Sequence, residues 1–361
     1  ILGLRNPGVI YFQKSLEFDK QFIYKVSGDV VQLLVGIGYA LIEPTAWAFV
    51  FGFIAADLTK LPISYLIHGY RPWLSFDLDI AKELIDYGKW LTGSSVLYFI
   101  YSQGDDAFVG WLLTPTSLAY YQYTYRFSNA PATELTQVVN SVMFPAFSKL
   151  QEDEERLRSA FLKTLRMTAF IAFPSSIGIA AIAPTFILAA FGEEWMPAVP
   201  VMQILAFYGL FRAIGRTISP VLKTIGRPDF ITKLSALRVI LLAITIYPLT
   251  AEFGIVGTAI AVTGIYVFPM MPLDIYIIAR AIDLRIPRIL YEFIYPALAC
   301  IPMGLIVWHL EPRVPLGPFL RLGTLILTGV VIFSASVLAI ESQSNWQVSD
   351  EIQRVFQSLA S

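Results

Sequence analysis

Long apolar runs alternate with short polar connections along most of the chain, and this pattern predicts a bundle of membrane-spanning helices. A helix rises about 1.5 Å per residue, so a hydrocarbon layer of about 30 Å requires about 20 mostly apolar residues. The windows that meet this requirement are 22–41, 46–68, 90–113, 117–147, 167–190, 199–222, 231–250, 255–279, 289–309 and 319–340. We therefore expect an all-α, polytopic membrane helical bundle with about ten transmembrane helices.

Lys and Arg are distributed asymmetrically between the predicted connections, which gives an independent test of the windows. Basic residues in short loops collect on the cytoplasmic side of a membrane. Seventeen of them lie in alternate connections, within 5–20, 71–89, 149–166, 223–233 and 280–288. The intervening connections hold none before Arg313 and Arg321. We expect a multi-pass protein of the cell membrane with both ends of this chain in the cytoplasm.

Two of the cytoplasmic connections are longer and amphipathic. Residues 76–88 and 152–166 place apolar side chains at three- and four-residue spacing, which is typical of helices that lie along the membrane interface. A plain lead-in to the following span explains the spacing equally well. Residues 341–361 are polar and are expected to form a short cytoplasmic tail.

Composition supports the membrane assignment and excludes several functions. The chain is 56% hydrophobic and only 15% charged, whereas soluble domains carry about 25% charged residues. A net charge of −1 gives no sign of a nucleic-acid partner. One cysteine excludes an internal disulfide, and two histidines leave no metal-ligand cluster, so we expect neither metal nor cofactor.

Ionisable residues within the predicted spans are the first candidates for function, because a charge in hydrocarbon costs at least about 2.5–3.5 kcal/mol. Asp105 lies eight residues before the outer end of its window, and Arg126 lies nine residues into the next. Both are then about 12–13 Å deep by helical rise. The hairpin predicts that Arg126 pairs with Asp105 or its neighbour Asp106.

The window that contains Arg126 is the most polar of the set. At 100° per residue, one continuous face carries Arg126, Asn129, Thr133, Glu134, Gln137 and Asn140. A surface in contact with lipid would not have this composition. We interpret Arg126, Asn129, Gln137 and Asn140 as substrate-binding residues in a cavity, with Glu134 as a charge partner.

Arg212 and Arg216 are four residues apart and therefore share a helix face. Two guanidinium groups in this arrangement suit bidentate binding of phosphate or pyrophosphate. The alternative is that they extend to cytoplasmic headgroups.

The remaining charges within the windows are interpreted as structural. The spacings of Lys25 with Asp29 and of Asp57 with Lys60 suggest local salt bridges along a helix. Arg238 and Asp274 are isolated in the sequence and are expected to serve as structural partners or to reach the headgroups.

The sequence shows no catalytic constellation and favours a transporter over an enzyme. It contains no Ser/His/Asp set and no glycine-rich phosphate loop. Asp77-Leu-Asp79 matches a metal-nucleotide motif, but its amphipathic helical context favours a chance match.

Six segments carry a family resemblance: Tyr87–Ser95, Asp105–Gly110, Leu118–Phe127, Met143–Leu150, Phe191–Ala198 and Ile225–Pro228. In the expected order, they resemble the polysaccharide and O-antigen flippases of the multidrug/oligosaccharidyl-lipid/polysaccharide exporter superfamily. The resemblance implies two six-helix lobes around a central cavity, with the first four or so helices absent from this chain. It then divides the chain into the end of the first lobe (1–87), a complete second lobe (88–280), two additional helices (281–340) and the tail.

For the whole protein, the resemblance implies alternating-access movement of a polyprenyl-pyrophosphate-linked oligosaccharide from the cytoplasmic to the outer leaflet. The expected partners are this lipid-linked oligosaccharide, membrane lipids, and glycan polymerases or glycosyltransferases of the same pathway. A cation-coupled multidrug or metabolite exporter of the same superfamily remains an alternative. So do a membrane-embedded polysaccharide polymerase or ligase, although the outer connections are short for one, and an inactive fragment.

Overall fold

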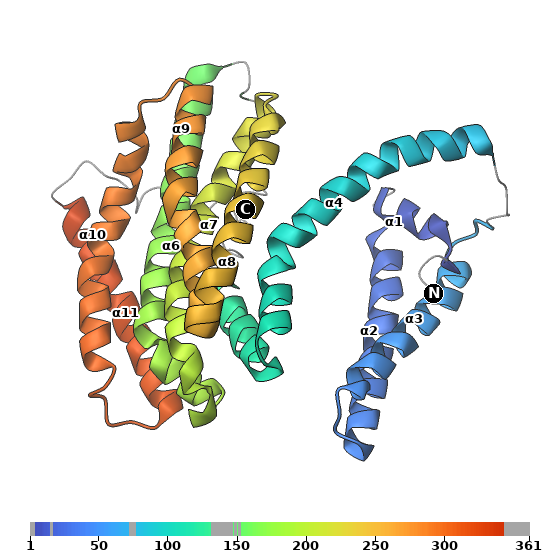
Figure 1. Ribbon diagram of the computed structural model, residues 1–361, viewed down its shortest axis with the longest axis horizontal. Coiled ribbons are helices and arrows are strands. Elements are labelled where there is room, and N and C mark those ends of the chain that lie inside the picture. The colour runs from blue at the N-terminus through green and yellow to red at the C-terminus, as the bar shows by residue number, and fades with distance from the viewer. Residues whose placement is uncertain are drawn as a thin grey trace. The chain divides into compact units, whose positions relative to one another are not determined.

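The computed structural model describes residues 4–14, 17–71, 77–130, 147, 150 and 153–342. Within these ranges every regular element is helical, which confirms the all-α prediction. The chain forms two compact units, Ile1–Lys89 (unit 1) and Trp90–Ser361 (unit 2), and each is considered by itself (Figure 1).

Unit 1 is built on a helical hairpin of α2 (Phe18–Ile42) and α3 (Trp47–Ile67). The turn between them contains Pro44, which lacks the amide hydrogen needed to continue α2. A short N-terminal segment, η2 (Pro7–Val9) followed by α1 (Ile10–Lys14), precedes the hairpin. It is attached to α3 through the backbone amide of Asn6, which donates to the Ser64 hydroxyl at 3.0 Å.

The salt bridges of unit 1 differ from those predicted by spacing along one helix. Lys60 Nζ lies 3.0 Å from Asp29 Oδ1 on the opposite helix, and Asp57 pairs with Arg5. The prediction of local pairs was therefore wrong for both carboxylates. Packing of α2 and of the N-terminal segment on α3 brings partners within reach that are distant in the sequence.

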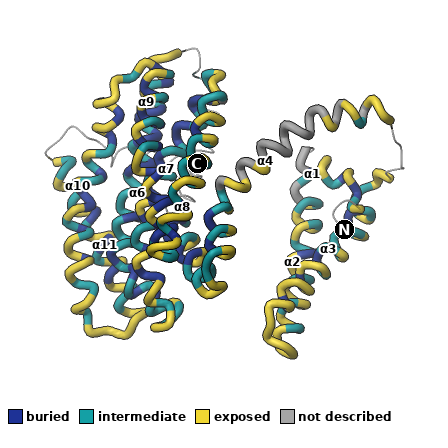
Figure 2. The backbone as a smooth tube through the Cα atoms, viewed as in Figure 1, coloured by how far each residue is buried: buried dark blue, intermediate teal, exposed yellow. Residues whose placement is uncertain are grey.

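Unit 2 contains most of the helices, and α7 (Val199–Thr224) lies at its centre. The other elements are most of α4 (Leu78–Leu112), helical residues 115–130, α6 (Glu154–Ala190), η3 (Glu193–Ala198), α8 (Pro228–Ile265), η4 (Tyr266–Met270), α9 (Met271–Ala281), α10 (Ile286–Leu310) and α11 (Pro318–Glu341). Helix α7 contacts α6, α8 and α9, while α10 and α11 pack on α6. Figure 2 shows buried residues concentrated along α6 and α7.

The amphipathic connections do not form separate interfacial helices. Helix α4 begins at Leu78 and continues to Leu112, and α6 runs from Glu154 to Ala190 without interruption. Asp153 caps α6 by accepting a hydrogen bond from the backbone amide of Arg156 at 3.1 Å. Both segments therefore continue directly into the following helix, which favours the lead-in alternative.

Seven helical segments in the described part of the chain are long and apolar enough to cross a membrane. They correspond to eight of the predicted windows, because Asp229–Ala281 contains both 231–250 and 255–279. Window 90–113 lies within α4, and window 117–147 begins in helical residues 115–130 and continues outside the described residues.

The long segment that contains α8 reverses direction at Gly254. The φ of Gly254 is +58°, in the left-handed region, and the hydroxyls of Thr250 and Thr258 lie 2.8 Å apart. In a continuous helix, residues eight apart would be separated by about 12 Å along the axis. The chain therefore forms a tight hairpin between the two predicted windows.

Polar contacts attach the last two helices to α6 at two levels. In the first half of α6, Arg166 binds both carboxylate oxygens of Glu292 on α10, at 2.7 and 3.2 Å. Near the C-terminal end of α6, Thr185 donates to Glu311 at 2.6 Å, and Arg321 reaches the same carboxylate at 3.2 Å.

Gly257 allows the close approach of the two arms of the α8 hairpin, and substitution tests that role. A Cβ added to Gly257 would lie 1.8 Å from the carbonyl oxygen of Leu249. Because backbone atoms must move, we expect Gly257→Ala to lower stability by about 1–3 kcal/mol. The measurement is the midpoint of thermal unfolding of the detergent-solubilised protein.

Gly264→Ala is the matched control, because a Cβ at Gly264 meets no atom within 4 Å. We expect it to be neutral or stabilising by up to about 1 kcal/mol through helix propensity. Equal midpoints for the two variants would contradict the close-packed hairpin.

Candidate substrate-binding site

Asp105 lies inside unit 2 and is held by a tyrosine. It belongs to α4 and is only 5% exposed. The hydroxyl of Tyr121, which is completely buried, donates to Asp105 Oδ2 at 2.7 Å. A buried carboxylate requires such a donor, because an uncompensated polar group in a low-dielectric interior costs several kcal/mol.

Arg212 continues this polar cluster from α7, about halfway along the helix. Its Nη1 donates to the hydroxyl of Tyr125 at 2.8 Å, and that hydroxyl donates to the hydroxyl of Tyr208 at 3.2 Å. The guanidinium carbon also lies 5.8 Å from the centre of the Tyr208 ring. The central cation of α7 is therefore embedded among tyrosines.

Arg238 and Asp274 form a second polar group beside the first. Arg238 Nη2 lies 2.8 Å from Asp274 Oδ2, and both side chains are mostly buried. The Arg238 guanidinium also lies 5.0 Å from the centre of the Tyr266 ring. The two residues were predicted to be structural partners or to reach the headgroups, and this ion pair confirms the first alternative.

The two polar groups meet at a small internal cavity. Asp105, Tyr125, Tyr208, Arg238 and Tyr266 line a space of about 20 Å³, which is large enough for about one water molecule. The interior of unit 2 thus holds charges that are paired and closely packed. It has no room for a sugar at this position.

Arg126 does not bind Asp105. Its side chain is exposed, and among the described residues the bond to Asp105 comes from Tyr121. Five residues separate Tyr121 from Arg126, which turns them about 140° apart on the helix. The prediction compared only the depths of the two residues. It did not include which face of helical residues 115–130 turns towards α4.

Asn129 is also placed differently from its prediction. It is 3% exposed, and its side-chain amide donates to the backbone oxygen of Tyr125 at 2.9 Å. A Cβ on Gly209 of α7 would lie 3.2 Å from Asn129 Oδ1. In this structure Asn129 lies in a helix contact and does not line an open cavity, and its role in substrate binding stays a prediction.

The exposed face of helical residues 115–130 carries a polar pair, Gln122 and Arg126, beside the aromatic residues Tyr123 and Phe127. Asp106 of α4 lies within hydrogen-bonding reach of Gln122. Asp106 is partly buried and lies beside this exposed face, whereas Asp105 is buried.

The other predicted residues are either partly buried or outside the described ranges. Arg216 is partly buried on α7, four residues after Arg212. Glu134, Gln137 and Asn140 lie outside the described residues, and so does most of the predicted polar stripe. Their role as charge partner and substrate-binding residues stays a prediction.

Sequence reasoning missed the tyrosines of the internal cluster. Tyr121, Tyr125, Tyr208 and Tyr266 are not among the residues that the sequence predicted for the site. The contact of Tyr208 with Arg212 could have been predicted from the sequence, because residues four apart on a helix are neighbours.

A family model described as "Polysaccharide biosynthesis protein" matches residues 1–200. Lipopolysaccharide biosynthesis protein WzxC of Escherichia coli is 28% identical over 235 residues, which are 63% of this chain and 47% of that protein. Teichuronic acid biosynthesis protein TuaB of Bacillus subtilis is 25% identical over 244 residues, or 66% of this chain and 49% of that protein. The chain thus spans about half the length of these relatives.

A solved structure supports the fold. Lipid II flippase MurJ in its inward closed conformation superimposes with a TM-score of 0.70 and 16% sequence identity. The match covers 91% of this chain and 69% of that chain. At this identity the likeness establishes the fold alone.

Tyr121→Phe tests whether the buried carboxylate depends on its donor. The substitution removes only the hydroxyl that bonds to Asp105, and we expect a loss of about 1–3 kcal/mol in stability. Tyr123→Phe removes a hydroxyl from an exposed tyrosine on the same helix and should change stability by less than about 0.5 kcal/mol. The measurement is the midpoint of thermal unfolding of both variants. An unchanged midpoint in Tyr121→Phe would rule out the dependence of Asp105 on this donor.

Proposed function

Because the chain belongs to the polysaccharide biosynthesis protein family, we propose that the protein moves a lipid-linked oligosaccharide from the cytoplasmic to the outer leaflet. The substrate is a saccharide joined through pyrophosphate to a polyprenyl lipid, and it serves surface polysaccharide or glycoprotein synthesis. The lipid tail remains in hydrocarbon while the polar head crosses through protein. This activity is transport and requires no covalent step.

The observation that carries the proposal is a match to this family in a chain whose segments long and apolar enough to cross a membrane contain cationic side chains such as Arg212 and Arg238. An anionic pyrophosphate in hydrocarbon requires compensating positive charge. Arg126 supplies such a charge on the exposed face of helical residues 115–130.

Arg212 and Arg216 have a different role in this proposal. Arg212 is bonded to Tyr125 within a closed cluster, so it is not open to substrate in this conformation. Alternating access requires a second conformation, in which helices that pack together here separate. Arg212 and Arg216 then become available to the pyrophosphate when the cluster opens.

The remaining features of the proposal concern topology and partners. The protein is a multi-pass membrane protein, and the distribution of Lys and Arg supports cytoplasmic placement of both ends of this chain. Glycosyltransferases and polymerases of the same pathway would supply the substrate and consume the product.

The direct test is transport by the full-length protein in proteoliposomes that contain a fluorescent polyprenyl-pyrophosphate oligosaccharide. Accessibility of the saccharide to an external lectin reports its movement between leaflets. We expect the protein to accelerate this movement relative to protein-free vesicles. Acceleration of phospholipid alone would contradict the proposed substrate.

Arg126→Ala tests the exposed cation in cells. We expect loss of surface glycan with an unchanged protein level, because an exposed side chain contributes little to folding. Gln122→Ala, one turn away on the same exposed face, is the control for local disruption and should retain more glycan. Normal surface glycan in Arg126→Ala would remove Arg126 from the proposed site.

A further inference from the structure

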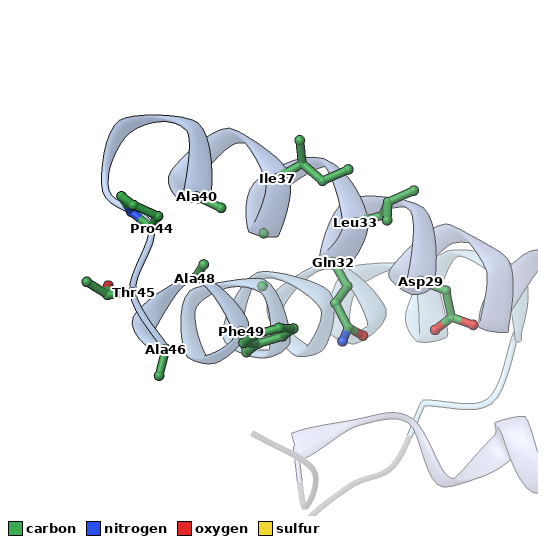
Figure 3. A pocket seen from close by; sticks show the side chains of 12 residues that line it. Asp29, Gln32, Leu33, Ile37, Ala40, Pro44, Thr45, Ala46, Ala48 and Phe49 are labelled. Atoms are coloured by element: carbon green, nitrogen blue, oxygen red, sulfur yellow. The ribbon is translucent and has the colours of Figure 1, made fainter. Parts of the chain in front are cut away.

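Unit 1 contains an open groove between α2 and α3 (Figure 3). Its volume is about 770 Å³, within the range of about 300–1,000 Å³ that is usual for small-molecule sites. Apolar residues such as Ile37 and Ala40 form one end of the groove. Asp29 and Gln32 bring a carboxylate and an amide to the other end, and Phe49 borders it from α3.

The polar end of this groove lies near the middle of the membrane span. Asp29 is thirteen residues before the end of α2, and Lys60 is thirteen residues after the start of α3. Helical rise then places both at about 20 Å from the outer ends of their helices. The Asp29 side chain is nevertheless 65% exposed. Since a charge facing lipid costs at least about 2.5–3.5 kcal/mol, we infer that this face meets water or a polar ligand.

The position of Lys60 depends on a glycine of α2. A Cβ added to Gly28 would lie 2.0 Å from Lys60 Cε, so the lysine stem crosses α2 directly over Gly28. This route brings the ammonium group to Asp29 at 3.0 Å. The ion pair leaves the second carboxylate oxygen of Asp29 available as an acceptor at the groove.

The groups around the groove match the chemistry of a sugar ring. A pyranose presents hydroxyls, which donate to carboxylate and carbonyl oxygens and accept from amide hydrogens; Asp29 and Gln32 offer all three. It also presents an apolar C–H face, which packs on an aromatic ring. Phe49 borders the groove with a side chain that is 72% exposed.

We propose that this groove binds sugar rings of the lipid-linked oligosaccharide. Asp29 and Gln32 hold hydroxyl groups and Phe49 packs against the ring. The inference rests on the proposed function and extends it: unit 1 recognises the saccharide, and the arginines of unit 2 compensate the pyrophosphate. The residues that determine which glycan is accepted are then located in unit 1.

Cysteine protection in the full-length protein tests this proposal. Gln32→Cys, in a background without other cysteines, is labelled in proteoliposomes with a charged methanethiosulfonate. Leu34→Cys is the matched control: Leu34 is 65% exposed but about 200° away from Gln32 on the same helix, outside the groove. Because the reagent is charged and excluded from lipid, we expect Gln32→Cys to react at least about tenfold faster.

The ligand is tested with a farnesyl-pyrophosphate-linked disaccharide. At ten times its dissociation constant, this probe should slow labelling of Gln32→Cys about tenfold by occupancy. Farnesyl pyrophosphate without sugar should give no protection. Ile37→Cys, also in the groove, provides the same readout should Gln32→Cys fail to fold.

Three results would overturn the proposal: labelling of Gln32→Cys no faster than that of Leu34→Cys, absence of protection, or equal protection by the sugar-free probe. Transport by the unmodified protein is measured in parallel. Transport without protection contradicts this inference alone. Protection without transport contradicts only the proposed function.

Discussion

The cost of placing charge in hydrocarbon is the constraint on which the rest of this structure depends. Unit 2 meets it by pairing: Asp105 is bonded to Tyr121, Arg238 to Asp274, and Arg212 to tyrosine hydroxyls. Each of these contacts joins side chains from different helical segments. The polar groups therefore do more than avoid lipid, because they also fix which helices are neighbours in the bundle.

This pairing has a consequence for the proposed transport. At the tyrosine cluster, the described interior of unit 2 leaves a cavity of about one water molecule, so a saccharide would not pass at this position without a change of conformation. Arg126 lies on such a surface, and unit 1 presents Asp29 at its own groove. Opening of the tyrosine cluster would expose Arg212 at a cost in broken hydrogen bonds, which substrate binding would offset.

Hydropathy predicted the spans well, because helix length and apolar composition are local properties of the sequence. The gap between the predicted windows 231–250 and 255–279 therefore coincides with the reversal at Gly254. Side-chain partners were predicted poorly. Arg126 was paired with Asp105 because the two residues lie at the same depth, but the helix is oriented so that Tyr121 makes the contact with Asp105. Arg238 and its partner Asp274 are brought together only by the α8 hairpin. Contacts between helices depend on rotation and packing, which one sequence does not specify.

The central claim is that paired charges form a closed polar cluster in unit 2 and that, under the proposed function, substrate meets the exposed polar faces. Photo-crosslinking of the full-length protein to an oligosaccharide lipid, with the reactive group beside its pyrophosphate, tests this claim most directly. Mass spectrometry should locate crosslinks around Gln122 and Arg126, and none near Leu327, which is exposed on α11. Crosslinks confined to α11 would contradict the account.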